Sequence, residues 1–171
     1  MKDVFLVYDK SCFYEIVILN YFMSFSNCDM VFCSLGGKPV RTMEGFSVNV
    51  AKPLEALDKE QIRSFILPGG NISEIDTPEV KAYLQALMER EILIAGICAG
   101  VDVLDHAGIL CDVKSIHSSE VDLVTDKNVI TARANAYVDF AVEVAKKLDL
   151  FASEDDLQET INFWKHYQRV Q

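Results

Sequence analysis

Short apolar runs alternate with longer amphipathic segments along most of the chain. Buried parallel strands are predicted for the near-continuous apolar runs at residues 3–8 and 92–97. Strands are also predicted at residues 29–35 and at 64–70, where the strand ends in a Gly-rich turn. Between them, residues 13–25 and 77–91 have helical length and an apolar face, and Thr77 followed by Pro78 marks a helix start. Strands that alternate with helices predict a doubly wound, mainly parallel α/β sheet with helices on both faces. Sites in such folds lie beyond the carboxyl ends of the strands, so the loops after the first strand, after "FILP" and after "ILIAGI" are expected to converge.

The pattern becomes less regular in the stretches that join and follow these elements. Further strands are predicted at residues 45–52, 113–117, 121–125 and 128–133, with a hairpin turn at 125–128. Further helices are predicted at residues 99–108, 137–151 and 153–170. Ser153 and Asp156 are spaced as a capping box at the start of the last helix. No repeat or linker interrupts the chain, so residues 1–171 are expected to form a single domain.

Composition narrows the class of protein. Half of the 171 residues are apolar, and the formal net charge is −10. A charge of this sign argues against binding to nucleic acid or to an anionic membrane surface, both of which favour basic faces. No signal peptide or membrane-spanning run is evident, so a cytoplasmic protein is expected. The five cysteines are odd in number and contain no CxxC pair, which favours reduced thiols over a disulfide framework or a metal site.

One cysteine has the sequence context of a nucleophile. Cys98 lies between Gly96 and Gly100, at the end of a predicted strand and the start of a predicted helix. This G-x-C-x-G pattern is typical of a strained turn that exposes a reactive side chain. The helix N-terminus is expected to lower the pKa of the thiol. The amides of Ala99 and Gly70 are candidates for an oxyanion hole. The alternative is a small buried cysteine without function.

Several residues are candidates for the acid or base that exchanges a proton with Cys98. His106 is expected to complement the C-terminus of its own helix, and His166 to lie on the surface of the last one. His117, at a predicted strand end, is the best histidine candidate for a base. Glu15 begins the helix that follows the first strand. It is either a first-turn glutamate favoured by the helix dipole or a buried carboxyl group that stays protonated beside Cys98.

Taken together, four segments resemble the ThiJ/PfpI superfamily, including its parkinsonism-associated deglycase branch. They are "FYEIVILNYF", "FILPGGN", "IAGICAGVDVL" and "VITARANAYVDFAVEVAK", and the resemblance covers about residues 3–150. It implies a flavodoxin-like fold of the class I glutamine-amidotransferase type. It also implies a homodimer without a metal ion or an organic cofactor.

The resemblance assigns a role to each candidate residue. It implies that Cys98 is the nucleophile and that Glu15 is its protonated carboxyl partner. It places the oxyanion-hole amides at Gly70 and Ala99. The histidine of the late strand-end segment corresponds to His117.

Three departures from the family pattern limit what can be transferred. Protease-like members have a histidine directly after the nucleophile, where this chain has Ala99. The Gly-Pro-Gly loop of deglycase-type members is replaced by "ARANAY", so Asn135 and Tyr137 are expected to line a differently shaped pocket. Ser118 follows His117 where the family often has proline.

Two functional hypotheses follow. The first is a cofactor-independent cysteine enzyme, a lyase or hydrolase of the glyoxalase or deglycase type, which acts on small reactive carbonyls through Cys98 and Glu15. Protease and amidotransferase activities are less favoured. The alternative is a non-catalytic redox sensor or stress-protective protein in which Cys98 is oxidised.

The remaining cysteines have simpler interpretations. Cys12 lies three residues before Glu15 and is either a resolving thiol or a loop cysteine without a partner. Packing roles are expected for the other three: Cys28, Cys33 and Cys111.

Overall fold

A seven-stranded sheet forms the centre of the computed structural model, which describes residues 1–169. The strand order is β5-β2-β1-β6-β7-β9-β8, and every pairing is parallel except that of β8 with β9. In this order the strands are Lys52–Pro53, Met30–Ser34, Lys2–Leu6, Ile62–Leu67, Leu93–Ile97, Val129–Ala132 and Leu123–Asp126. A separate antiparallel pair joins β3 (Val40–Arg41) to β4 (Ser47–Val48). The predicted α/β class with a mainly parallel sheet is confirmed.

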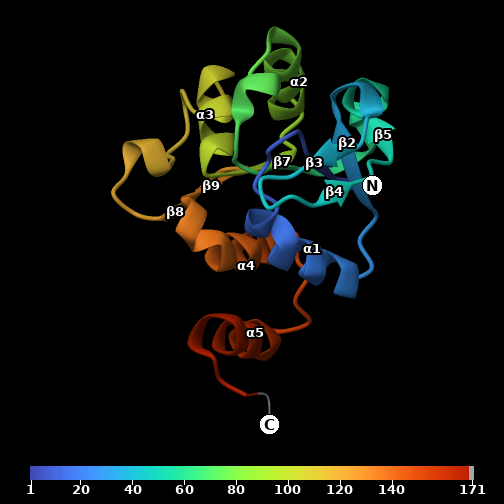
Figure 1. Cartoon of the computed structure of the whole chain (residues 1–171). Helices are drawn as coiled ribbons and strands as arrows, with labels where there is room; N and C mark the ends of the chain where they lie inside the picture. The colour runs from blue at the N-terminus through green and yellow to red at the C-terminus, as the bar shows by residue number, and fades with distance from the viewer. Residues whose placement is uncertain (170–171) are drawn as a thin grey trace.

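Helices cover both faces of this sheet (Figure 1). The five α-helices are α1 (Tyr14–Phe25), α2 (Pro78–Met88), α3 (Ala99–His106), α4 (Tyr137–Lys147) and α5 (Glu154–His166). Helices α2 and α3 pack on one face, and α1 and α4 pack side by side on the other. Helix α5 lies outside α4, where Trp164 contacts the rings of Tyr21 and Phe22 on α1.

Alternation of side chains along the strands builds two apolar cores. On β1, Val4 and Leu6 face the core under α2 and α3, whereas Phe5 faces the core under α1 and α4. All three side chains are fully buried. A strand buried on both faces has no polar alternation, which explains the continuous apolar runs in the sequence.

Helix starts follow the capping signals. The Thr77 hydroxyl accepts a hydrogen bond from the Val80 N–H at 3.4 Å, and Pro78 occupies the first turn of α2. Ser153 likewise accepts from the Asp156 N–H at 3.2 Å. The reciprocal half of the predicted capping box differs, because the Asp156 carboxylate accepts from the N–H of Ala152 rather than from that of Ser153.

The strand predicted at residues 113–117 is wrong. Residues Ile116–Ser118 form a 3₁₀ turn, in which the Ser115 hydroxyl accepts from the His117 N–H at 3.2 Å. The Ile116 N–H bonds to the Thr131 side chain instead of a neighbouring backbone carbonyl. Local serine hydrogen bonds compete successfully with a strand ladder here.

Other boundaries shift without changing the element type. The strand predicted at residues 45–52 is divided between β4 and β5, which belong to different sheets. Helix α4 ends at Lys147, and α5 ends at His166, where the sequence predicted 151 and 170. Residue 170 lies outside the described residues. Across residues 1–169, every helix is too short or too polar to cross a membrane.

Candidate active site

Cys98 lies at the junction of β7 and α3 in a conformation that is rare for a residue with a side chain. Its φ is 56° and its ψ is −131°. A non-glycine residue in this region carries a conformational cost of about 1–3 kcal/mol, and such strain concentrates at functional sites. The turn is fixed by a 2.9 Å hydrogen bond from the Cys98 N–H to the Ala132 carbonyl of β9. The side chain is half-buried. The expected elbow is present.

Glycines allow other backbone segments to approach this elbow closely. A Cβ atom at Gly100 would lie 2.3 Å from the Leu67 carbonyl oxygen, and one at Gly96 would lie 2.7 Å from Leu104 Cδ1. The third close approach involves Gly69, where a Cβ atom would lie 2.6 Å from Cys98 Cβ and 2.9 Å from Cys98 Sγ. The turn after β6 therefore packs directly on the cysteine.

Glu15 extends from the first turn of α1 into the same region. Only 1% of its surface is exposed. Its Oε2 accepts a 2.6 Å hydrogen bond from the Gly69 N–H. Its Oε1 is buried and has no hydrogen-bond partner among the described residues. Burial raises the pKa of the Glu15 carboxyl, although the Gly69 N–H, Cys98 and Tyr14 lower it in part.

Opposing effects act on the pKa of the Cys98 thiol. Burial raises its pKa, and the neighbouring Glu15 carboxylate raises it further, whereas the Ala99 N–H lowers it. The amide at the helix N-terminus therefore lowers the pKa of the thiol as expected, but burial and Glu15 outweigh it, and the pKa is raised on balance. Glu15 thus disfavours the thiolate, whereas Cys98 favours the carboxylate, and two groups this strongly connected titrate as a coupled pair.

Tyr14 is a member of the cluster that the sequence did not single out. Its hydroxyl is close enough to Glu15 to lower the pKa of that carboxyl. Its ring contacts Tyr137 edge-on, with centroids 5.7 Å apart. The Tyr14 N–H donates to Glu44 Oε1 at 2.8 Å, so a residue from the turn between β3 and β4 caps a helix that has no side-chain cap of its own. Tyr14 directly precedes Glu15, and this adjacency was the available signal.

Cys12 borders the site as well. Its N–H donates to the Gly69 carbonyl at 2.8 Å. Burial, followed by the charges of Glu15 and Cys98, raises the pKa of the Cys12 thiol to about 11. Tyr8 is fully buried, and its hydroxyl donates to the Pro68 carbonyl at 2.9 Å. The loops after β1, β6 and β7 thus converge as the sequence predicted.

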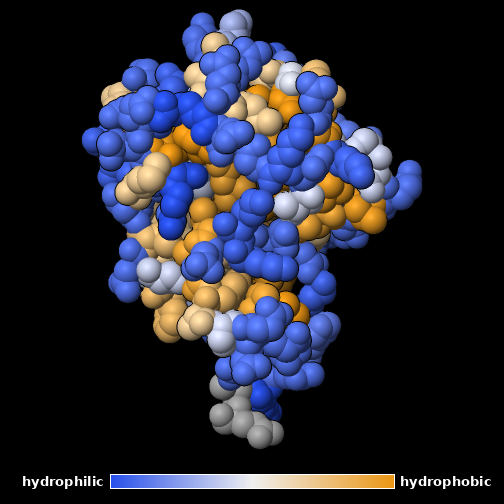
Figure 2. All heavy atoms as spheres, turned by 180° about the vertical axis from the view of Figure 1, so that it is seen from behind, coloured by the Kyte–Doolittle hydropathy of each residue, from blue (hydrophilic) through white to orange (hydrophobic). Residues whose placement is uncertain are grey.

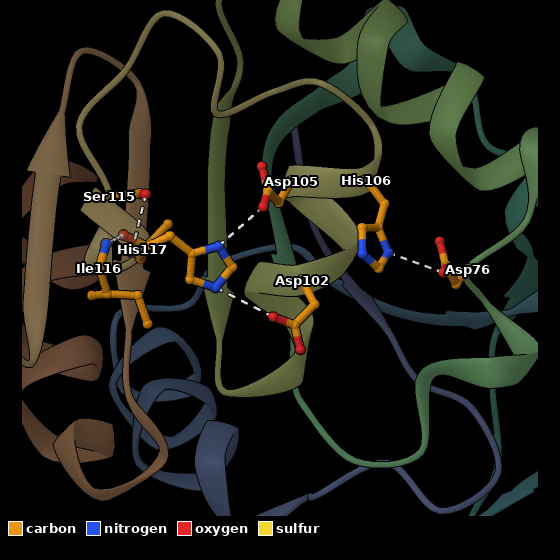
Figure 3. Close-up of polar contacts among 8 residues, drawn as sticks. Asp76, Asp102, Asp105, His106, Ser115, Ile116 and His117 are labelled. Carbon is orange, nitrogen blue, oxygen red and sulfur yellow. Dashed lines mark hydrogen bonds and ion pairs between the residues drawn. The ribbon is translucent and has the colours of Figure 1, made fainter. Parts of the chain in front are cut away.

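His117 is held by aspartates of α3 rather than by the cysteine (Figure 3). Its Nε2 lies 3.2 Å from Asp102 Oδ1, and its Nδ1 lies 3.2 Å from Asp105 Oδ2. On the opposite side of α3, His106 Nδ1 contacts Asp76 at 3.0 Å. The base role assigned to His117 stays a prediction, and its ring nitrogens are both occupied in this conformation.

Gly70 and Asn135 are the other residues that the sequence predicted for the site. Gly70 has a φ of 120°, and a Cβ atom there would lie 2.1 Å from the Lys10 carbonyl oxygen, so this position requires glycine. Asn135 lies exposed in the 3₁₀ turn before α4. Within residues 1–169, no cluster of three or more His, Cys, Asp or Glu side chains has an arrangement that could hold a metal ion.

Comparisons with known proteins identify a family and a relative of similar sequence. The model of the DJ-1/PfpI family matches residues 1–147. A Bacillus subtilis protein named "Uncharacterized protease YoaZ" is 31% identical, and the match covers 77% of this chain and 70% of that protein.

Solved structures show the same fold. A DJ-1 superfamily protein from Agrobacterium tumefaciens superposes with a TM-score of 0.87 at 25% identity, over 98% of this chain and all of that one. Oxidized DJ-1 from Toxoplasma gondii gives a TM-score of 0.79 at 19% identity, over 95% and 96% of the two chains. Drosophila melanogaster DJ-1beta gives the same TM-score, identity and coverage.

Proposed function

The chain belongs to the DJ-1/PfpI family, and from this premise we propose that it is a cofactor-independent cysteine enzyme acting on small reactive carbonyl compounds. The activity would be of the glyoxalase or deglycase type. One observation carries the proposal: Cys98 occupies a strained elbow beside Glu15, whose carboxyl group is buried with one oxygen unpartnered. An unpartnered buried oxygen next to a nucleophile is a group placed to exchange a proton with a substrate.

The first step uses the proton shared by Cys98 and Glu15. When the thiolate of Cys98 bonds to an aldehyde carbon, the π electrons of the carbonyl move to its oxygen. Protonated Glu15 gives its proton to that oxygen, which yields a neutral hemithioacetal and a carboxylate. The amides of Ala99 and Gly70 are the proposed donors to the developing negative charge.

For a 1,2-dicarbonyl substrate, the same carboxylate completes the reaction. It removes the hydrogen from the carbon bonded to sulfur and returns it to the adjacent carbon through an enediol. The result is a thioester of Cys98, which water cleaves to a 2-hydroxy acid and the free thiol. This sequence needs no cofactor because the oxidation of one carbon balances the reduction of its neighbour.

Proteolysis is less favoured, although the Bacillus subtilis relative has "protease" in its name. A thiol protease uses a histidine base within hydrogen-bond reach of the thiol. Here Ala99 follows the cysteine, and the ring nitrogens of His117 contact Asp102 and Asp105. These features support a reaction whose proton transfers run through Glu15.

The test is turnover of methylglyoxal, followed as 2-hydroxy acid formed, because disappearance of the aldehyde alone also reports simple thiol adducts. Cys98→Ala should abolish product formation, and Glu15→Gln should reduce it by about hundredfold or more. Cys111→Ala is the matched control, since that thiol follows the C-terminus of α3 and is exposed, so the packing role predicted for it is wrong. Product formation at the wild-type rate by Cys98→Ala would refute the proposal.

A redox role is the second candidate, and the unpartnered Glu15 Oε1 also favours it. Two equivalents of peroxide would convert the Cys98 thiolate to a sulfinate with release of water, and protonated Glu15 would donate a hydrogen bond to one sulfinate oxygen. The Toxoplasma gondii relative was solved in an oxidized form. Intact mass after mild peroxide treatment should show two added oxygens at Cys98 in the wild type but not in Glu15→Leu. Equal oxidation of both proteins would exclude a stabilising role for Glu15.

A homodimer is proposed as the assembly. Helix α1 exposes Val17, Tyr21 and Phe25 along one face, and Phe25 is 80% exposed. Apolar patches also lie between polar residues on the reverse side of the molecule (Figure 2). Light scattering on the wild type should give twice the chain mass of 19.2 kDa, and Phe25→Glu should give the monomer mass. A wild-type monomer at assay concentrations would refute this assembly.

A further inference from the structure

The turn between β3 and β4 is tied to the segment that joins β1 to α1. The Met43 N–H donates to the Ser11 carbonyl at 2.9 Å. The next contact is the hydrogen bond from the Tyr14 N–H to Glu44 Oε1, at 2.8 Å. The turn therefore lies along the segment that carries Glu15 and ends on the first turn of its helix.

Glu44 projects from a turn that is closed by its own hydrogen bonds. The Thr42 N–H donates to the Phe46 carbonyl at 2.9 Å, and Thr42 Oγ1 accepts from the Phe46 N–H at 3.1 Å. The Gly45 N–H donates to the Thr42 carbonyl at 3.0 Å. Thr42 is only 3% exposed, so it anchors the turn in the protein. The backbone of Glu44 is thus held on both sides.

Helix α1 depends on this carboxylate for its cap. The first N–H groups of an α-helix have no acceptor within the helix, and a polar side chain at the N-cap usually supplies one. The N-cap of α1 is Phe13, which has no side-chain acceptor, and Glu44 supplies it instead. Although partial burial acts in the opposite direction, hydrogen bonds from the N–H groups of Tyr14 and of Glu44 itself lower the pKa of the Glu44 carboxyl. The acceptor is therefore a carboxylate at neutral pH.

The capped N–H belongs to the residue directly before Glu15. Glu15 Oε2 accepts from the Gly69 N–H at 2.6 Å, and Gly69 packs on Cys98. The hydrogen bond at the Tyr14 N–H fixes the backbone from which the Glu15 side chain extends, and the one from Gly69 fixes its carboxyl group. A first turn that loses its cap frays, which moves the carboxyl group relative to the thiol.

We propose that Glu44 is a positioning residue, which accepts the Tyr14 N–H and thereby holds the carboxyl group of Glu15 against Gly69 and Cys98. The inference rests on the pair of Glu15 and Cys98 in the proposed function but not on any substrate. Glu44 acts through the first turn of α1 and has no contact of its own with the thiol among the hydrogen bonds of the described residues.

The experiment measures alkylation of Cys98 by iodoacetamide in the full chain between pH 5 and pH 8.5, quantified on the peptide that contains Cys98. Only the thiolate reacts, so the pH profile of the rate reports on the carboxyl group beside it. Glu15→Gln defines the profile of a thiol without that group. Burial raises the pKa values of Cys12 and Tyr14 to about 11 and about 12, so neither changes charge in this range.

Glu44→Ala should move the profile in the same direction as Glu15→Gln but less far. The rate at neutral pH should change by about two- to tenfold, the range for loss of a capping acceptor. Glu44→Gln should keep the wild-type profile, because its amide oxygen still accepts from the Tyr14 N–H. In the Glu15→Gln background, Glu44→Ala should have no further effect.

Glu74→Ala is the matched control. Glu74 Oε2 accepts from the Asp9 N–H at 3.0 Å, so it is a second carboxylate that holds the backbone of the segment between β1 and α1. Its hydrogen bond lies near the end of β1 and not on the first turn of α1. Its loss should leave the profile of Cys98 unchanged.

Three results would overturn the proposal: a wild-type profile in Glu44→Ala, a change that persists in the Glu15→Gln background, or a Glu44→Gln profile that matches that of Glu44→Ala. Thermal unfolding shows whether each variant is folded. If Glu44→Ala does not fold, Glu44→Met, which keeps the length of the side chain without its oxygens, takes its place.

The same measurements separate this inference from the proposed function. If Glu15→Gln itself leaves the profile unchanged, Glu15 and Cys98 are not paired, and the inference fails together with the proposed function. A change in Glu15→Gln that Glu44→Ala does not share refutes the positioning role alone. Absence of methylglyoxal turnover with the expected profiles refutes only the carbonyl activity.

Discussion

The backbone N–H of Gly69 donates a 2.6 Å hydrogen bond to Glu15 Oε2 and so ties the turn after β6 to the first turn of α1. The same glycine packs on Cys98, where a Cβ atom would come within 2.9 Å of Sγ. One residue without a side chain therefore positions both the carboxyl group and the thiol. The arrangement fixes Glu15 through one oxygen and leaves the other free of partners among the described residues.

Glu15→Gln should stabilise the protein at neutral and alkaline pH, even though it impairs the proposed reaction. Burial raises the pKa of Glu15 above that of the unfolded chain. The folded state thus binds more protons between these two values, and the free energy of unfolding falls as pH rises through that interval. Glutamine is uncharged throughout and avoids this loss.

Thermal unfolding at pH 4 and pH 8 measures the effect. The two proteins should unfold at similar temperatures at pH 4, and the variant should unfold at the higher temperature at pH 8. Each kcal/mol of difference corresponds to about 2–4 °C for a chain of this size. A variant that is less stable than the wild type at pH 8 would show that the charged carboxylate is well accommodated.

The sequence predicted the parts of the site that depend on local pattern. Cys98 was found because small residues flank it at a strand-to-helix junction, and Glu15 because it begins the first helix after a strand. Their convergence followed from the rule that sites in parallel sheets lie beyond the carboxyl ends of the strands. Short-range sequence patterns and the sheet topology are therefore enough to locate both residues.

Contacts between segments that are distant in the sequence could not be predicted from local patterns. Nothing local distinguishes Gly69 from Gly70 as the donor to Glu15, and Glu44 caps α1 from 30 residues away. The segment before His117 has strand-like residues, but the hydroxyls of Ser115 and Ser118 bond to its backbone and turn it. The pKa of Cys98 depends on burial and on Glu15, which only the folded chain brings together.

Gly69→Ala should damage the nucleophile more than the fold. The added Cβ would lie 2.6 Å from Cys98 Cβ, so the elbow must shift, at a cost of about 1–3 kcal/mol in stability. We expect at least a tenfold slower alkylation of Cys98, together with a lower unfolding temperature. Gly36→Ala is the control for a glycine substitution without a steric clash, because its φ of 66° disfavours alanine but no heavy atom lies within 4 Å of the new Cβ. It should lower stability and leave Cys98 unaffected, and wild-type alkylation in Gly69→Ala would contradict the packing argument.

Cys12 should react slowly with alkylating reagents at pH 8. Burial, with Glu15 and Cys98, raises the pKa of its thiol to about 11, so its reactive thiolate is a minor species there. The rate should rise about tenfold per pH unit up to that value, as the thiolate fraction does. Peptide mass spectrometry at several pH values compares Cys12 with the exposed Cys111. A Cys12 that matches Cys111 at pH 8 would instead favour the role of a resolving thiol.

Tyr14→Phe should reduce carbonyl turnover while leaving the nucleophile intact. The phenol lies beside Glu15 and Cys98, and burial with the charge of Glu15 raises its pKa to about 12, so the hydroxyl remains a hydrogen-bond donor throughout the assay range. The ring packing against Tyr137 is preserved in phenylalanine. If the hydroxyl donates to the alkoxide that forms on thiolate addition, its loss should lower kcat/KM for methylglyoxal by about tenfold or more, approaching the effect of a buried oxyanion donor.

Alkylation of Cys98 by iodoacetamide develops no alkoxide and should keep its wild-type rate. Tyr21→Phe, which removes a hydroxyl from the same helix away from the cluster, is the control for both measurements. Equal losses of turnover and alkylation in Tyr14→Phe would mean that the phenol only maintains the geometry of Glu15 and Cys98.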